Sequence, residues 1–506
     1  MKRITGTCTL AHFLKTRAQL VIGLIVSAQS GLAAAPQCER LTTLMIPNTT
    51  VISASPSARA SQNFCLATAV VRPVADSEIR VEIWLPPAEE WNGKFLGTGN
   101  GGYSGTLSYG EMEAALRKGY ATAGSDTGHS GGDLRFGLGH PEKIQDWGHR
   151  AVHVMTETAK LLVHVYYGHF PSYSYFSGCS TGGHQALMEA QRYPEDYDGI
   201  LAGAPGNNRV RLNVGFLWSW MTLRKAPGDP LPPSKLPLLN RAAIAACDAM
   251  DGVKDGLIGD PARCRFDPGT LVCRGADAPD CLTADQVAAV RLIYEGARNP
   301  RTHEQLFTGW ARGTEAGWAS YFVGRPEPAR VDFWRYWVFY DPAWDPLTFD
   351  FDRDVAYADT RMSFLTANSP DLRDFQKRNG KLLVYHGWAD PVAPPEESIR
   401  YYESVSRIMG GYAKLAPFYR LFLAPGMGHC SGGPGPNSFD GLGALDQWVT
   451  RSVAPDRIIA SHSTGGKVDR TRPLCPYPLI ARWKGTGNSD EAAEFVCAVP
   501  AAPARK

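Results

Sequence analysis

The chain has 506 residues, of which 44% are hydrophobic and 20% charged, an ordinary composition for a globular protein and too apolar for a disordered one. Its formal net charge is +2, but residues 1–35 carry four basic and no acidic side chains, which leaves 48 basic and 50 acidic residues in the remainder. This balance gives no support for a nucleic-acid partner. The length allows a large core and an inserted domain.

Residues 1–35 are typical of a secretory signal peptide. They combine basic residues near the start, a short apolar run over residues 20–26 and small residues at 33–35. The run is too short to cross a bilayer, although a retained membrane anchor is the alternative. We therefore expect a secreted or periplasmic protein that has no membrane partner once the signal is removed.

Ten cysteines follow the signal segment, an even number that favours five disulfides in an exported chain. No C-x-x-C pair is present, which argues against a zinc ribbon or a redox motif. Neighbours in the sequence suggest four pairs: Cys38 with Cys65, Cys247 with Cys264, Cys273 with Cys281, and Cys475 with Cys497. The sequence alone does not fix these pairings. If they are correct, Cys179 and Cys430 are the two cysteines that remain without an assigned partner.

Strand-like runs alternate with turns over residues 66–125, and residues 146–167 have helical spacing. The run 173–178 (YSYFSG) predicts a short strand, and residues 184–194 (HQALMEAQRYP) favour a helix. Between them lies G-C-S-T-G, with Ser180 at its centre. A strand, a sharp turn flanked by glycines and a helix form the context that a G-x-S-x-G nucleophile requires.

Residues 207–372 differ from the segments on either side, because they are rich in Trp, Pro and Asp and lack strand–helix alternation. We interpret them as an insertion that covers the active edge of a sheet, with a separate tandem domain as the alternative. Beyond the insertion, residues 381–387 and 419–426 predict two more buried strands, and residues 442–451 predict a final helix. Strands that alternate with helices indicate an α/β sheet.

Three residues occur in the order serine, acid, histidine that α/β-hydrolases use. A serine hydroxyl becomes a good nucleophile beside an imidazole that takes its proton, and a carboxylate orients that imidazole. Asp390 and His429 each follow a predicted strand, on loops at its carboxyl end, where open α/β sheets place their sites. The sequence therefore predicts a catalytic triad of Ser180, Asp390 and His429.

Each assignment has an alternative. Asp390 also suits a turn-capping aspartate, and His462 is the other histidine that follows it. We expect His184 to pack behind the nucleophile and His129 to hold its own loop. Cys179 is disfavoured as the nucleophile, because an exported setting favours its oxidation.

An oxyanion hole needs two backbone N–H groups aimed at the developing negative oxygen. Thr181, the residue after the nucleophile, is expected to supply one of them. The glycine-rich run 97–105 (GTGNGGYSG) is expected to supply the other, from Gly101 or alternatively Gly102, unless it is an ordinary glycine turn.

Cys179 precedes the candidate nucleophile, and Cys430 follows the candidate base. If these two pair, the disulfide fastens the serine turn directly to the histidine loop. It would also close a very long loop, which places its stabilisation toward the upper end of the ~0–5 kcal/mol range in the chain-entropy model.

Serine and histidine each flanked by cysteine, together with the run 178–208 (GCSTGGHQALMEAQRYPEDYDGILAGAPGNN), resemble the tannase and feruloyl esterase family. The resemblance covers roughly residues 38–500. It implies an α/β-hydrolase core over residues 36–206 and 373–506, a lid over residues 207–372, a Cys179–Cys430 disulfide and hydrolysis of aromatic carboxylic esters. The family also includes bacterial enzymes that hydrolyse the mono-ester of terephthalate and ethylene glycol.

The insertion holds Asp248, Asp251 and Asp255 within eight residues. Three carboxylates this close repel one another unless a cation lies among them, and oxygen ligands on a loop with glycines suit Ca²⁺. The spacing is not that of an EF-hand, and a solvated acidic turn is the alternative. The resemblance implies a structural calcium ion in the lid, held by these three side chains and the carbonyls of Val253 and Leu257.

Aromatic residues crowd the insertion, and we expect some to stack on a flat acyl group while most form its core. They are Trp218, Trp220, Trp310, Trp318, Tyr321, Phe322, Trp334, Trp337, Phe339 and Tyr340. Arg325 is a candidate for contact with a substrate carboxylate or phenol.

We therefore expect a secreted or periplasmic serine esterase that cleaves hydroxycinnamoyl- or galloyl-type esters through an acyl-enzyme. A terephthalate mono-ester hydrolase, another small aromatic ester or polyketide hydrolase, and a peptidase on the same core are alternatives. A non-enzymatic binding module is disfavoured, because no triad member is lost. The preferred acyl group, the alcohol and the oligomeric state are not defined by the sequence.

Overall fold

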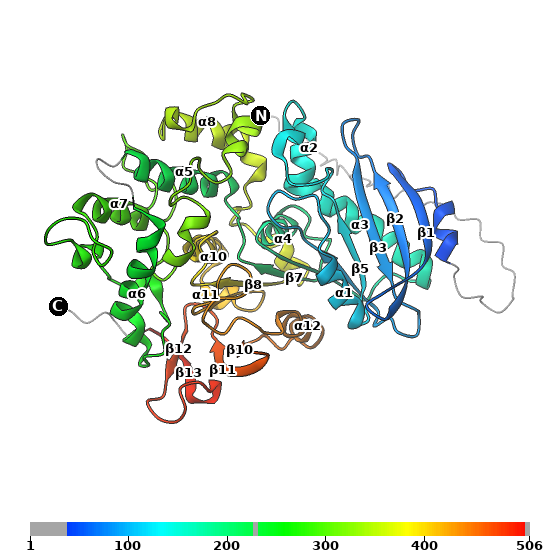
Figure 1. Ribbon diagram of the computed structural model, residues 1–506. Helices are drawn as coiled ribbons and strands as arrows, with labels where there is room; N and C mark the ends of the chain where they lie inside the picture. Colours follow the sequence, from blue (N-terminus) through cyan, green and yellow to red (C-terminus); the bar gives the residue numbers. More distant parts are fainter. Residues whose placement is uncertain (1–37, 226–230, 501–506) are drawn as a thin grey trace, which may run out of the picture. The chain divides into compact units, whose positions relative to one another are not determined.

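The fold is organised around a nine-stranded mixed sheet (Figure 1). This computed structural model describes residues 38–225 and 231–500, so the signal peptide predicted over residues 1–35 lies outside the described residues. In sheet order the strands are β1 (Thr49–Arg59), β2 (Gln62–Val71), β3 (Ile79–Leu85), β5 (Ala121–Ser125), β4 (Lys94–Thr98), β6 (Tyr173–Cys179), β7 (Gly199–Gly203), β8 (Lys381–Gly387) and β9 (Tyr419–Ala424). The pairings from β1 to β5 are antiparallel, and those from β5 to β9 are parallel.

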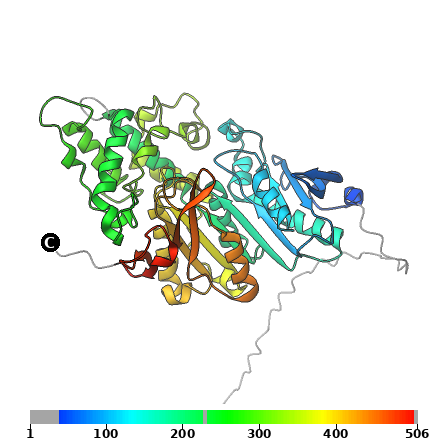
Figure 2. The ribbon, with the colours of Figure 1, turned by 60° about the horizontal axis from the view of Figure 1, so that its bottom comes forward.

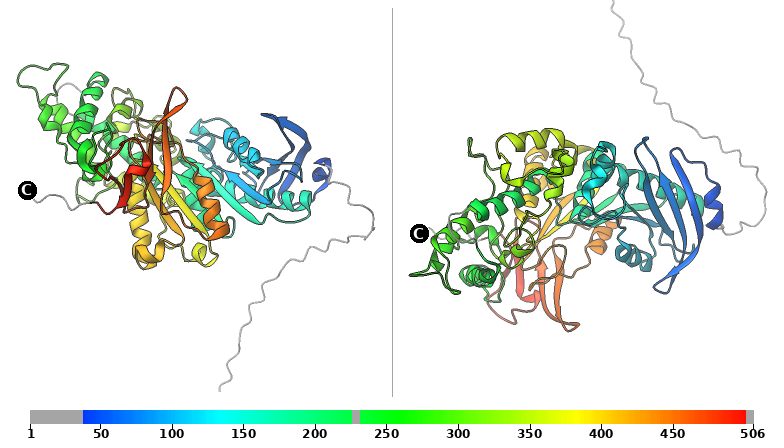
Figure 3. Two further views of the ribbon diagram at one scale, coloured as in Figure 1. Left: turned by 90° about the horizontal axis from the view of Figure 1, so that it is seen from below. Right: turned by 45° about the horizontal axis from the view of Figure 1, so that its top comes forward.

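Helices cover both faces of this sheet (Figures 2 and 3). One face packs against α3 (Ala151–Tyr167), α4 (Thr181–Arg192) and α10 (Pro395–Met409). The opposite face packs against α1 (Tyr109–Arg117) and α12 (Gly441–Arg451). Every residue of β5 and β7 is buried, as expected for strands covered on both sides. The predicted α/β architecture is confirmed, with strands and helices close to the predicted positions.

The inserted segment, residues 207–372, adds no strand to the sheet within its described residues. Its longer helices are α5 (Arg209–Lys225), α6 (Leu236–Cys247), α7 (Ala284–Glu295) and α8 (Arg353–Arg361), drawn in green in all three ribbon figures. They surround an apolar cluster rich in buried tryptophan, to which Tyr103 and Trp147 contribute from outside the segment. The segment therefore packs continuously onto the part of the chain that carries the sheet.

The two ends of the inserted segment lie side by side. The Ala367 N–H donates to the Asn207 carbonyl over 2.8 Å. The Asn207 side-chain amide donates to Asn368 Oδ1 over 2.6 Å, and a β-bridge pairs Asn208 with Thr366. The segment therefore leaves the sheet after β7 and returns before the adjacent strand β8 through one narrow neck.

The helix predicted over residues 146–167 is divided. A π-helix (Asp146–Arg150) precedes α3, and a short helix, α2 (Pro141–Gln145), comes before it. The inserted segment packs closely against this irregular turn, because a Cβ on Gly148 would lie 2.6 Å from Leu365 Cδ2. The wider turn buries Trp147 and His149. Such π-turns often occur beside functional sites.

Two C-terminal hairpins were not predicted: β10 (Ile458–Thr464) with β11 (Lys467–Leu474), and β12 (Ile480–Trp483) with β13 (Phe495–Ala498). The first turns at Gly465 and Gly466, both with positive φ, a glycine pair that signals a hairpin.

The structure contains the four disulfides suggested by sequence neighbours, Cys38–Cys65, Cys247–Cys264, Cys273–Cys281 and Cys475–Cys497. Among the described residues, no helix combines the length and apolarity needed to span a bilayer.

Candidate active site

Ser180 occupies the sharp turn between β6 and α4. Its φ of 64° and ψ of −113° lie outside the regions that residues with side chains prefer, so the turn holds backbone strain. Glycine is required beside it, because a Cβ on Gly178 would lie 2.7 Å from the Cα of Gly182. The Ser180 N–H donates to the Gly203 carbonyl over 2.9 Å, which ties the turn to the end of β7. This local structure matches the geometry of a nucleophile turn in an α/β sheet.

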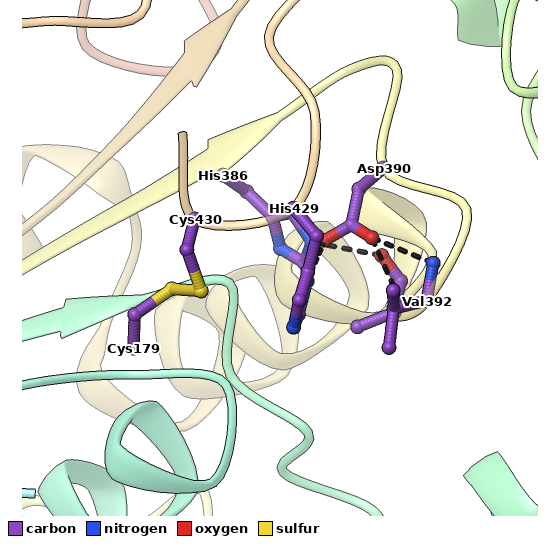
Figure 4. The surroundings of a disulfide bond; sticks show 7 residues. Cys179, His386, Asp390, Val392, His429 and Cys430 are labelled. Atoms are coloured by element: carbon purple, nitrogen blue, oxygen red, sulfur yellow. Dashed lines mark hydrogen bonds and ion pairs between the residues drawn. A yellow bond between two sulfur atoms is a disulfide. The ribbon is translucent and has the colours of Figure 1, made fainter. Parts of the chain in front are cut away.

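His429 and Asp390 lie together on the loops that follow β9 and β8 (Figure 4). The distance from His429 Nδ1 to Asp390 Oδ2 is 2.6 Å, so the ring donates its Nδ1–H to the carboxylate. This bond leaves Nε2 of His429 free to accept a proton. The other carboxylate oxygen of Asp390 accepts the N–H groups of Val392 at 2.7 Å and Ala393 at 3.1 Å.

A second histidine, His386, bonds to the same carboxylate and was missed by the sequence analysis. Its ring is fully buried, and Nε2 lies 3.1 Å from Asp390 Oδ2 and 2.8 Å from the Ala393 carbonyl oxygen. Both neighbours are acceptors, so Nε2 carries the proton. Nδ1 lies 2.8 Å from Ser398 Oγ, which donates to it in the neutral ring. The H-x-x-x-D spacing at the end of β8 was the available signal.

These contacts determine the charge on Asp390. Burial alone would raise the pKa of this fully buried carboxyl group, but the charge and hydrogen bond of His429 and the hydrogen bond of His386 hold the pKa well below its ordinary value. Asp390 therefore stays ionised at neutral pH and can keep the His429 ring in the tautomer described above.

The disulfide between Cys179 and Cys430 joins the serine turn to the histidine loop (Figure 4). It links residues 251 positions apart and brings their Cα atoms to 5.8 Å, so the pairing expected from the sequence is present. Within residues 38–225 and 231–500, no hydrogen bond joins the Ser180 hydroxyl to the His429 ring. Catalytic hydrogen bonds of ligand-free sites often form only when substrate binds.

The glycine-rich loop after β4 packs against the first turn of α4. A Cβ on Gly99 would lie 2.5 Å from the Cα of Gly182, and the Asn100 N–H donates to Gln185 Oε1 over 2.9 Å. The Thr181 hydroxyl donates to the Gly102 carbonyl over 2.6 Å. A Cβ on Gly101 would meet no atom within 4 Å, so this residue borders open space. The two predicted sources of oxyanion-hole N–H groups are thus adjacent.

The other histidines considered in the sequence have structural contacts. His184 is fully buried on α4, where its Nε2 lies 2.8 Å from the Leu365 carbonyl, and burial lowers its pKa to about 3. His129 Nε2 lies 2.8 Å from the Tyr103 carbonyl within its loop. His462 lies on the β10–β11 hairpin, 2.6 Å from Asp469.

The acidic loop of the inserted segment turns its carboxylates toward its own backbone. Asp248 Oδ1 accepts the Asp255 N–H at 3.0 Å, and Asp251 Oδ1 accepts the Val253 N–H at 3.2 Å. Asp255 pairs with Arg472. Asp251 is buried and forms no ion pair among the described residues, and burial raises its pKa to about 6. A buried carboxylate that forms no direct ion pair, although the charge of Arg472 acts on it, is compatible with a bound cation.

The described residues contain one compact cluster of potential metal-ligating side chains, and it lies outside the acidic loop. Donor atoms of three His, Cys, Asp or Glu side chains lie within 4.8 Å of one another only at Cys273, Asp277 and Cys281 within residues 38–225 and 231–500. The two cysteines form a disulfide, so they do not act as metal ligands. The carboxylates of the Asp248–Asp255 loop lie farther apart than this.

Most aromatic residues singled out in the inserted segment form its core. Trp310, Trp318, Trp334 and Trp337 are at most 2% exposed. Trp218, Tyr321 and Phe339 are partly buried against the same cluster.

Arg325 donates to the Ser320 carbonyl over 3.1 Å, within its own loop. Its predicted contact with substrate stays a prediction.

A sequence model of the tannase and feruloyl esterase family matches residues 65–498. The chain is 38% identical to an uncharacterized esterase of Xanthomonas campestris, over 100% of this chain and 98% of that protein. It is 35% identical to a mono(2-hydroxyethyl) terephthalate hydrolase of Piscinibacter sakaiensis, over 84% and 82% of the two chains, and 33% identical to a probable feruloyl esterase B-1 of Aspergillus flavus, over 90% of each.

Solved structures agree with this match. Feruloyl esterase B from Aspergillus oryzae superposes with a TM-score of 0.86 at 30% identity, over 91% of this chain and 99% of that one. A tannin acyl hydrolase from Aspergillus niger gives a TM-score of 0.76 at 23% identity, over 89% and 90%. The second likeness concerns the fold alone.

Replacing Cys179 and Cys430 by serine should lower the free energy of unfolding more than replacing Cys273 and Cys281. The chain-entropy model gives about 5 kcal/mol for the long loop and about 2–3 kcal/mol for the short one. Urea unfolding measures both, and labelling of Ser180 by a fluorophosphonate should slow only in the first variant. Equal losses, or a Cys179 found unpaired by non-reducing peptide mapping, would contradict this prediction.

His386→Ala should slow fluorophosphonate labelling of Ser180 by on the order of tenfold or more, because Asp390 loses a hydrogen bond that holds its orientation. His386→Gln should restore part of the rate, since its amide N–H can replace that of Nε2. His462→Ala is the matched control, because His462 also bonds to an aspartate but lies on the hairpin. Equal rates in the His386→Ala and wild-type proteins would show that the second histidine does not support the site.

Proposed function

The chain belongs to the tannase and feruloyl esterase family and is a carboxylic ester hydrolase, and from this premise we propose that it cleaves esters of small aromatic acids with Ser180, His429 and Asp390. Relatives of this chain are named for feruloyl and mono(2-hydroxyethyl) terephthalate esters. Hydroxycinnamoyl or galloyl esters are the proposed substrates, and a terephthalate mono-ester is the second candidate because of the 35% identity to that hydrolase.

The proposed reaction begins when the Ser180 oxygen attacks the ester carbonyl carbon. Nε2 of His429 takes the serine proton, because Nδ1 is held by Asp390. Collapse of the tetrahedral intermediate breaks the bond to the alcohol, which leaves with the proton that His429 returns. Water then attacks the acyl-enzyme by the same route and releases the acid. The negative charge on Asp390 stabilises the imidazolium in both steps.

Two backbone N–H groups are proposed to bind the negative oxygen of each tetrahedral intermediate. Thr181 supplies one from the start of α4, where the positive end of the helix dipole also favours negative charge. Gly101 supplies the other from the adjacent loop, with Gly102 as the alternative. The hydrogen bond from Thr181 to Gly102 supports this assignment, because it holds the two segments together.

One observation carries the proposal: His429 donates to a buried, ionised Asp390 on a loop that a disulfide ties to the serine turn. A binding protein would have no need of a pre-oriented imidazole beside a strained serine. The aromatic cluster of residues 207–372 supports an aromatic acyl group, and we propose that this inserted segment is the lid over the site.

We further propose that the chain is exported. Five disulfides are present within the described residues, and disulfides of this number persist in oxidising compartments. Removal of residues 1–35 and release to the periplasm or the medium are part of this proposal, which for these residues rests on the sequence pattern.

We also propose that the acidic loop of the lid binds Ca²⁺. Asp248, Asp251, Asp255 and the carbonyls of Val253 and Leu257 are the proposed ligands. The buried Asp251 without an ion-pair partner among the described residues supports the site, and the Cys247–Cys264 disulfide braces the loop. The role proposed for the ion is structural, because the loop pairs with Arg472 on β11 and not with a member of the proposed triad.

The wild-type protein should hydrolyse methyl ferulate, methyl gallate or mono(2-hydroxyethyl) terephthalate, and should leave a peptide panel intact. Ser180→Ala should lose activity by on the order of 10⁴–10⁶, because the hydroxyl of the following residue, Thr181, already donates to the Gly102 carbonyl. Product release followed by chromatography gives kcat and KM for each ester. Full ester turnover by Ser180→Ala would overturn the assignment of this site, and peptide cleavage would overturn the proposed substrate class.

Removal of calcium should lower the melting temperature, and added Ca²⁺ should restore it. An ion present at about 100 times its Kd stabilises a protein by about 2.7 kcal/mol. Asp251→Asn should abolish the response to Ca²⁺. Asp267→Asn is the control, because Asp267 lies in a neighbouring loop and pairs with Arg291. A melting temperature that does not change with Ca²⁺ in the wild-type protein would contradict the proposed site.

A further inference from the structure

Arg209 carries a charge that is buried beside the nucleophile turn. It is the first residue of α5, in the segment that follows β7, and only 1% of its surface is exposed. In the part of the chain that the structure describes, no carboxylate forms an ion pair with it, and its Nε has no hydrogen-bond partner. Arg211, two residues later on the same helix, pairs instead with Asp359.

Such a group is expensive to bury. A charge without a counter-ion costs several kcal/mol in the protein interior. The rings of Tyr103 and Trp147, 5.6 and 5.1 Å from the guanidinium carbon, offset only part of this cost through cation–π contacts. Burial, with a further contribution from Arg330, lowers the pKa of Arg209 to about 10, so the group is still charged at neutral pH. Stability alone therefore does not explain this residue.

Its hydrogen bonds lead to the proposed oxyanion hole. Nη2 of Arg209 donates to the Thr181 hydroxyl over 3.1 Å, and that hydroxyl donates its own proton to the Gly102 carbonyl over 2.6 Å. A hydroxyl that accepts from a cation becomes a stronger donor. The chain of bonds thus starts at a fixed positive charge and connects the residue after the nucleophile with the glycine loop that faces it.

We propose that Arg209 is a positioning residue for the oxyanion hole, and that its counter-charge is the negative oxygen that forms during ester cleavage. Through the Thr181 hydroxyl it holds the two N–H-bearing segments in register, and its charge favours the tetrahedral intermediate over the neutral ester by way of that hydroxyl. Preorganised charge of this kind contributes to kcat because it needs no rearrangement when the reaction occurs. The inference rests on the proposed function and adds a residue outside the triad to the same site.

The test compares Arg209→Met and Arg209→Lys with the matched control Arg211→Met. Loss of a direct oxyanion donor costs about 10²–10³ in kcat, so an indirect contribution should be on the order of tenfold to a hundredfold. Arg209→Met should lose this factor in kcat with KM changed less than about twofold, and Arg209→Lys should recover part of it. Arg211→Met should keep the wild-type kcat.

A double-mutant cycle with Thr181→Val separates positioning from general packing. If Arg209 acts through the Thr181 hydroxyl, the double variant should be no slower than the slower single variant. Additive losses would overturn the inference, and so would an effect on KM alone, which would mean that the guanidinium recognises a charged substrate. If Arg209→Met fails to fold, the factor by which Arg209→Lys lowers kcat is compared with and without the Thr181→Val substitution, and equal factors overturn the inference.

Fluorophosphonate labelling of Ser180 provides a second readout, because the phosphonyl oxygen enters the oxyanion hole whatever the natural ester is. The expected result is that Arg209→Met is labelled more slowly than the wild-type protein, while its free energy of unfolding is unchanged. Wild-type labelling rates in this variant would overturn the inference while leaving the proposed function intact. Absence of labelling at Ser180 in the wild-type protein would refute the proposed function, and the inference with it.

Discussion

The covalent bond between Cys179 and Cys430 holds together two turns that are each unfavourable alone. Ser180 and Cys430 both have a positive φ, 64° and 66°, a backbone conformation that costs on the order of 1–3 kcal/mol at a residue with a side chain. The two turns belong to strands far apart in sequence, and the bond fixes their Cα atoms at 5.8 Å. The position of His429 relative to Ser180 is thereby set by covalent geometry as well as by packing.

The charged groups on the two sides of the Cys179–Cys430 disulfide, Asp390 and Arg209, differ in how well they are neutralised. On the side of the base, the Asp390 carboxylate is fully satisfied by two imidazole N–H groups and two backbone amides. On the side of the proposed oxyanion hole, Arg209 has a hydrogen bond and aromatic contacts but no negative partner among the described residues. If the proposed site is correct, its charges are balanced only when a negative charge forms on the substrate, which is how an enzyme stabilises a transition state more than a ground state.

The sequence indicated the triad candidates, because these depend on a local motif and on chain order, and it suggested four of the cysteine pairs, because their partners are 8 to 27 residues apart. His386 was within reach of the same reasoning, since a polar residue at the end of a buried strand lies four positions before Asp390. Arg209 was not, because its burial and its bond to Thr181 arise only when the insertion packs onto the serine turn. The close packing of Gly148, within the π-helix, against the distant Leu365 is likewise a long-range contact that helical periodicity cannot reveal.

The narrow neck at Asn207 and Asn368 has an evolutionary consequence. A segment whose two ends meet can lengthen, shorten or be replaced without forcing the neighbouring strands apart, since the closure cost of a longer loop grows only slowly with its length. If the segment between the asparagines is the lid that we propose, substrate choice can diversify there while the residues on the sheet stay unchanged. The segment between Asn207 and Asn368 is therefore the natural unit to exchange between relatives, both in evolution and in engineered chimaeras.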